Sequence, residues 1–240
     1  MHQLETVNSA HHSNTKVSQA GTLAQHRQVH MSHIVVQEFA EVAQYYPIFF
    51  AKDSDTGQFQ PVALFGLAVD ENIYHDSGLW QKCYLPLKLQ STPFYLSQDL
   101  DTQRPILAID SNDARVNEQQ GEALFNNGKA SPYLQQQSVI LSELTQGFVL
   151  NSAFINELLA YNLLESVSLD IKYNNGQAQQ LTGLYTINKE MLEKVPSEVQ
   201  TQFQQQGYTA LLSAAMASVS HVSTLIDIKN RLLASKSKAQ

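Results

Sequence analysis

The sequence predicts an α+β protein, in which an antiparallel sheet of short strands in the N-terminal half is packed by long helices and one β-hairpin from the C-terminal half. Three observations predict this class. Between residues 45 and 110, runs rich in β-branched and aromatic residues alternate with turn residues. After residue 132, leucines recur at the three- and four-residue spacing of helices. Two alternating segments also meet at an Asn-Gly pair, which favours a tight hairpin turn.

The first 32 residues form a polar leader with few aliphatic side chains and no apolar period. A segment that buries little apolar surface cannot offset the entropy cost of being ordered, so we expect it to be disordered. Its histidines favour adventitious metal binding over a designed site, because a specific site needs ligands held at fixed geometry. We therefore predict a leader over 1–32, a single domain over 33–235 and a tail over 236–240.

The N-terminal half of that domain begins with a short amphipathic helix over residues 35–46. Pro47 ends it, because proline disfavours the α conformation for the residue before it. Short runs of β-forming residues follow, and the first two are expected to pair as a hairpin around the polar turn at 53–57. The predicted strands are 48–50, 61–67, 72–75, 93–96 and 105–110.

The C-terminal half is predicted to be mostly helical. A long helix over 132–164 carries Gly147, which is expected to bend or divide it. A hairpin then follows, and the sequence leaves open whether it extends the first sheet or stands apart. Asn188 is expected to cap the next helix, which Pro196 limits. The remaining predicted elements are the hairpin strands 169–173 and 181–187 and a last long helix over 208–233.

Composition argues against several classes of function. The chain has 15 Lys and Arg against 22 Asp and Glu, a formal charge of −7, which disfavours nucleic acid and anionic lipid surfaces as partners. Cys83 is the only cysteine, so no intrachain disulfide can form. No glycine-rich phosphate loop, dinucleotide fingerprint or paired metal motif is found, so we predict no cofactor and no metal.

The apolar segments are too short to predict a membrane protein. No run of about 18 apolar residues is present, so no transmembrane segment is expected. The leader also lacks the apolar region of a signal peptide. The sequence therefore favours a cytoplasmic protein.

The order and spacing of several segments resemble the SapC family of bacterial proteins over residues 32–233. The segments are EFAEVAQYYPIFF, PVALFGL, NIYHDSGLWQKCYLP, PFYL, GEALF and LTGLYTINKEML. The resemblance implies a link to surface-layer formation and to neighbouring genes for tryptophan-halogenase-like flavoenzymes and outer-membrane receptors. The family commonly has two arginines just before its PF dipeptide, whereas residues 89–92 here are Leu-Gln-Ser-Thr.

Polar and aromatic side chains in the β-rich region are the candidates for a ligand or partner site: Tyr74, His75, Trp80, Tyr84 and Asp110. His75 and the following aspartate could form an acid–base pair beside Trp80, although Asp-Ser-Gly is ordinary turn chemistry and the turn is favoured. Asp110 ends an apolar strand where the family pattern has an ID pair. With the acidic residues after it, Asp110 could bind a divalent cation, but local capping is favoured.

Two functions from different classes remain. The first is a non-catalytic accessory protein of the SapC type that holds a partner protein or a small-molecule ligand, possible partners being an envelope component or a flavoenzyme. The second is an enzyme whose aromatic-lined site acts on an aromatic or glycan-like molecule. No catalytic residue is assigned, because the one triad-like set lies on a single predicted helix that lacks an exposed elbow: Ser220, His221, Ser223 and Asp227. A homo-oligomer is left open.

Overall fold

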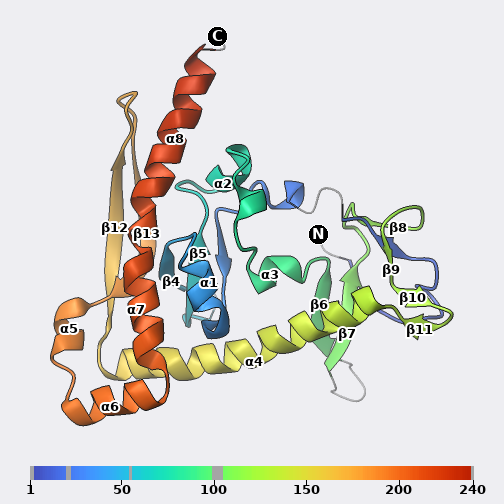
Figure 1. Ribbon diagram of the computed structural model, residues 1–240, viewed down its shortest axis with the longest axis horizontal. Helices are drawn as coiled ribbons and strands as arrows, with labels where there is room; N and C mark the ends of the chain where they lie inside the picture. Colours follow the sequence, from blue (N-terminus) through green and yellow to red (C-terminus); the bar gives the residue numbers. More distant parts are fainter. Residues whose placement is uncertain (1–2, 20–22, 54–55, 99–104, 239–240) are drawn as a thin grey trace. The chain divides into compact units, whose positions relative to one another are not determined.

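The computed structural model describes residues 3–19, 23–53, 56–98 and 105–238 (Figure 1). It confirms the α+β class, because helices occur together with small antiparallel sheets. The chain divides into two compact units, whereas the sequence predicted a single domain. Unit 1 comprises residues 1–25 and 87–146, and unit 2 comprises residues 26–86 and 147–240.

Unit 1 is built from short strands. Its main sheet has the order β1-β7-β6, and a smaller sheet has the order β8-β2-β9. The strands of these two sheets are β1 (Leu4–Thr6), β6 (Phe94–Gln98), β7 (Pro105–Asp110), β2 (Lys16–Val17), β8 (Val116–Asn117) and β9 (Glu122–Ala123). The unit also contains the small hairpin of β10 (Phe125–Asn126) and β11 (Lys129–Ala130), the helix α3 (Leu87–Gln90) and the first half of α4 (Pro132–Ala160).

The described part of the leader differs from the predicted disorder. β1 pairs antiparallel with β7, with Leu4 opposite Asp110, and β2 lies between β8 and β9. Val17 is buried in this small sheet. The strands β1 and β2 of the leader form because their backbone bonds to strands about a hundred residues further along the chain, and the composition of the leader does not reveal those partners.

Unit 2 contains a five-stranded antiparallel sheet with the order β12-β13-β4-β5-β3. The predicted hairpin of β4 and β5 is confirmed, since Phe49 lies opposite Val62. The C-terminal hairpin extends this sheet through Leu184 and Tyr185, which pair with β4. The five strands are β3 (Met31–His33), β4 (Ile48–Lys52), β5 (Phe59–Leu64), β12 (Leu164–Lys172) and β13 (Ala178–Ile187).

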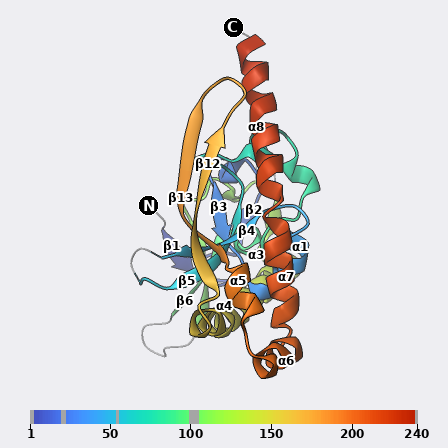
Figure 2. The ribbon, with the colours of Figure 1, turned by 90° about the vertical axis from the view of Figure 1, so that its left-hand side faces the viewer.

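Helices complete unit 2, and Figure 2 shows the β12–β13 hairpin alongside α7 and α8. The predicted helix over 208–233 is divided into α7 and α8 near Val219. The helices after α4 are α5 (Lys189–Glu193), α6 (Ser197–Gln205), α7 (Tyr208–Ser218) and α8 (His221–Lys238). Short helical turns earlier in the unit are η1 (Ala24–His26), which begins in unit 1, η2 (Val36–Glu38), α1 (Phe39–Val42), α2 (Ile73–Asp76) and η3 (Trp80–Lys82).

The prediction of a strand over 72–75 was wrong, because this segment forms α2. The side chain of Asn72 accepts a hydrogen bond from the backbone N–H of His75 at 3.0 Å. This is N-cap geometry, which supplies a partner for an amide that the helix itself leaves free. The capping bond explains why residues with high strand propensity adopt a helical turn here.

Gly147 does not divide α4, which continues to Ala160. The glycine instead permits a close approach, because a Cβ at this position would lie 2.4 Å from Cγ1 of Val35. One turn further on, the fully buried Asn151 accepts a hydrogen bond from the Val36 N–H at 2.9 Å and donates one to the Ile34 carbonyl at 2.8 Å. Within unit 2, α4 therefore supplies hydrogen bonds to an extended segment as a neighbouring strand would.

Candidate functional site

The aromatic residues around Trp80 form a closely packed part of the unit 2 core. Trp80 and Tyr74 are 2% and 3% exposed. The Tyr46 ring lies 4.8 Å from the Tyr74 ring in a T-shaped contact, and the Phe65 and Trp80 rings lie 5.6 Å apart. Such contacts stabilise a core beyond the area that the rings bury.

The tyrosine hydroxyls of this cluster donate to groups of the protein itself. Tyr74 Oη lies 2.6 Å from the Tyr45 carbonyl oxygen, and Tyr46 Oη lies 2.8 Å from the Tyr84 carbonyl oxygen. The hydroxyl of Tyr84 donates to the carboxylate of Glu38 at 3.0 Å. Burial raises the pKa of Tyr74 and of Tyr46 above the ordinary value. These phenols are therefore protonated hydrogen-bond donors at neutral pH.

His75 lies at the edge of this cluster. Its Nδ1 is 3.5 Å from Oδ1 of Asp76, and its ring is 6.4 Å from the Trp80 ring. Asp76 Oδ1 also lies 3.4 Å from Nε of Arg27. The predicted His75–Asp76 pair is therefore present at the longest distance that a hydrogen bond allows, and Asp76 has a second, cationic neighbour.

Asp110 belongs to unit 1, whereas the other four candidate residues belong to unit 2. Its Oδ1 accepts hydrogen bonds from the backbone N–H groups of Gln3 at 2.9 Å and Asn112 at 3.2 Å. The bond from Asn112 is the kind of local contact that the sequence favoured for this residue, whereas the bond from Gln3 joins residues that are 107 positions apart in the chain. Among the described residues, no group of three or more His, Cys, Asp or Glu side chains is placed to hold a metal ion.

A buried ion pair in unit 1 was not predicted from the sequence. The guanidinium of Arg115 donates to both carboxylate oxygens of Asp113, at 3.1 Å and 2.8 Å, and the two side chains are 5% and 11% exposed. Burial acts to raise the pKa of Asp113, but the hydrogen bonds from Arg115 outweigh it, and the pKa lies below the ordinary value. This bidentate pair connects two residues of the same turn.

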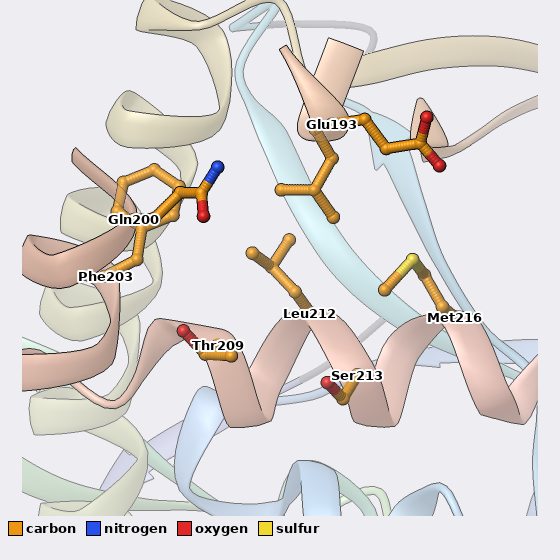
Figure 3. Close-up of a pocket in the computed structure, with 8 residues that line it drawn as sticks. Glu193, Gln200, Phe203, Thr209, Leu212, Ser213 and Met216 are labelled. Atoms are coloured by element: carbon orange, nitrogen blue, oxygen red, sulfur yellow. The ribbon is translucent and has the colours of Figure 1, made fainter. Parts of the chain in front are cut away.

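A cavity of about 400 Å³ lies between α5, α6 and α7 in unit 2 (Figure 3). Figure 3 shows Leu212 and Met216 pointing into it from α7, with Gln200 and Phe203 on α6. Its apolar floor and few polar groups are typical of ligand sites. The lining residues are Leu192, Glu193, Gln200, Phe203, Thr209, Leu212, Ser213 and Met216.

A second cavity of about 410 Å³ adjoins the first at Met216, which lines both. Its other lining residues are Glu165, Thr186, Ile187, Asn188, Lys189, Glu190 and Val219. We call the two cavities together the α7 groove. Three carboxylates and one ammonium group line it, and none of these four side chains forms an ion pair with another described residue.

Local sequence signals shape the α7 groove. Asn188 caps α5 by accepting a hydrogen bond from the Met191 N–H at 3.0 Å. Pro196 immediately precedes α6, and Gly207 adopts a φ of +78° between α6 and α7, which favours glycine. The cap and the proline limit were predicted, but the groove was not, because its walls come from separate helices and from the strands β12 and β13.

Three members of the triad-like set, which lie at the start of α8 and just before it, contact backbone groups through their side chains. Ser220 and Ser223 donate to carbonyls of their own helical turns, at 2.8 Å and 2.7 Å. His221 Nε2 lies 3.0 Å from the Ala43 carbonyl oxygen. These contacts give no nucleophile–base pair among the three side chains.

A comparison with models of known protein families identifies the family of this chain. A model of the SapC family matches residues 7–225 of the 240-residue chain. This chain belongs to the SapC family. No curated protein and no solved structure gave a match. The family match therefore confirms the resemblance noted in the sequence.

Two helical stretches of this SapC protein are long and apolar enough to cross a membrane by length and composition. They are Pro132–Ala160 and Tyr208–Ser235, and 39% and 22% of their most apolar windows are buried within the protein. A core helix of a water-soluble protein can pass the same test. The finding is therefore weak evidence, and the absence of a transmembrane segment stays a prediction.

Proposed function

We propose that this SapC protein is a non-catalytic accessory protein that binds its partner in the α7 groove. The observation that carries the proposal is a contrast within unit 2. The α7 groove is open, has an apolar floor and is lined by charged side chains that form no ion pair with another described residue, whereas the hydroxyls of the aromatic cluster donate to groups of the protein. An open apolar floor with few polar groups suits binding.

The wider role remains part of the same proposal. We propose that the protein is cytoplasmic and that it serves surface-layer or envelope functions, or assists a flavoenzyme of the tryptophan-halogenase type, as the resemblance noted in the sequence implies. The alternative enzyme would need reactive groups around Tyr74, His75 and Trp80. The contacts of those side chains favour a packing role, so we do not propose catalysis.

The proposal is tested by filling the α7 groove. Ser213 is exposed on α7 and lines the first cavity, so Ser213→Arg places a long charged side chain there. Binding of the uncharged apolar dye Nile red to dilute protein should weaken about tenfold, which corresponds to about 1.4 kcal/mol. A partner that co-purifies with the wild-type protein from its host should be lost as well.

Ser223→Arg is the matched control, because Ser223 is exposed on α8 and lines neither cavity of the groove. It should leave both dye binding and co-purification unchanged. Equal behaviour of the two arginine variants would contradict the α7 groove as the binding site. Circular dichroism should show native helix content in both variants.

A further inference from the structure

The floor of the α7 groove follows the axis of α7. Leu212, Met216 and Val219 are spaced by four and three residues, so they lie on one face of this helix. Seven residues at 1.5 Å per residue extend over roughly 10 Å, which is two helical turns. The floor is therefore long enough to receive two turns of another helix.

The walls of the α7 groove favour a helix over an extended peptide. An added strand needs free backbone groups to pair with. The floor is formed by α7 and one wall by α6, helices of 11 and 9 residues whose interior backbone groups are bonded within each helix. Along α6 and α7 it is chiefly side chains that are available for contact, which suits helix-in-groove recognition.

The charge of the α7 groove specifies a basic occupant. Glu165, Glu190 and Glu193 line it against Lys189 alone, and none of the four has an ion-pair partner among the residues described. Complementary charge guides association and selects partners. A cationic helix would pair with these carboxylates, whereas an acidic one would be repelled.

The chain carries such a segment at the end of α8. We call residues 231–238 the α8 tail; its sequence is RLLASKSK, with one arginine, two lysines and two leucines. The hairpin tip contacts α8 just before the tail, where the Asn174 N–H donates to Asn230 Oδ1 at 2.9 Å. In Figures 1 and 2, the end of α8 extends past the hairpin tip. The tail is two turns long, which matches the floor of the groove.

We propose that the α8 tail of one copy of this chain docks in the α7 groove of a second copy. The tail cannot reach the groove of its own copy, because all 18 residues of α8 lead away from α7 and α5 lies at the opposite end of unit 2 (Figure 1). The contact joins two different surfaces, so it is head-to-tail and produces a ring or an open chain of copies. This inference rests on the proposed function of the groove.

The test uses charge reversal in the full-length chain, measured by sedimentation over a concentration series. The wild-type protein should associate as its concentration rises. A tail variant, Arg231→Glu with Lys236→Glu, and a groove variant, Glu190→Lys with Glu193→Lys, should each associate at least about tenfold more weakly. An equimolar mixture of the two variants should restore association, because each tail then meets a groove of opposite charge.

The control is Lys82→Glu with Lys129→Glu, which changes two exposed lysines outside both the tail and the groove. It has the same change in net charge as the tail variant and should associate like the wild-type protein. A wild-type protein that stays monomeric, or variants that associate unchanged, would overturn the inference. If Nile red still distinguishes Ser213→Arg from Ser223→Arg in that case, the proposed function stands without self-association.

Discussion

The aromatic cluster around Trp80 and the α7 groove lie in the same unit but use polar side chains in opposite ways. In the cluster, hydroxyls donate to backbone carbonyls and to the buried carboxylate of Glu38. In the groove, Glu193 and its neighbours have no ion-pair partner among the described residues. The enclosed, hydrogen-bonded hydroxyls should therefore contribute to stability, and the exposed charged groups that form no ion pair with a described residue should contribute to binding.

The largest effect should come from the closed cluster. Trp80→Ala removes a side chain that is 2% exposed and should lower the free energy of unfolding by about 4 kcal/mol, because it leaves a large cavity. Urea unfolding followed by circular dichroism measures the change. The neighbouring Leu79→Ala is the control; its side chain is 38% exposed, and we expect a loss of about 1 kcal/mol or less. Equal losses would show that the cluster is not closed.

A buried and an exposed asparagine of α4 should differ in the same way as Trp80 and Leu79. Asn151→Ala leaves the Val36 N–H and the Ile34 carbonyl without their partner, so unfolding should cost about 3 kcal/mol less than in the wild type. Asn156→Ala changes an exposed asparagine of the same helix and should alter stability by no more than about 0.5 kcal/mol. Thermal unfolding distinguishes the two, and a similar melting temperature would contradict the assigned role of Asn151.

The buried ion pair between Asp113 and Arg115 in unit 1 should make the free energy of unfolding depend on pH. The pKa of Asp113 is lowered in the folded protein, so its ionised form stabilises the fold above the ordinary carboxyl pKa of about 3.9. That contribution is lost as the pH falls through the lowered pKa. Asp113→Asn should destabilise the protein by about 3 kcal/mol at pH 7, because it leaves Arg115 buried and unpaired.

The stability difference between wild type and Asp113→Asn should shrink as the pH falls below about 4. Urea unfolding at a series of pH values measures it. A difference that stays constant with pH would mean that the carboxylate charge does not contribute to the pair.

The smallest effect should come from the open groove. Glu193→Gln removes one exposed carboxylate without an ion-pair partner, so the free energy of unfolding should change by no more than about 0.5 kcal/mol. Self-association should weaken only about twofold, as expected for one exposed ion pair. Urea unfolding and sedimentation measure the two effects. A larger loss of stability than of association would reverse the roles assigned to the groove and the cluster.

The sequence by itself determined the elements that local chemistry controls. Periodic leucines predicted α4, and the Asn-Gly pair predicted the β12–β13 hairpin. Asn188 and Pro196 marked the limits of α5, since capping and proline act within a few residues. The succession of segments also predicted the family, which the match over residues 7–225 confirms.

The tertiary structure determined which of these elements pair or pack against one another. The ordering of the leader, the role of Gly147 and the α7 groove each depend on residues far apart in the chain. Residues close together in the sequence suggested a site at Trp80; in the fold Tyr74 and Trp80 are buried in the core, whereas His75 and Tyr84 are partly exposed. The physical reason is that burial and hydrogen-bond partners are properties of the folded neighbourhood, whereas propensity and capping are properties of the local chain.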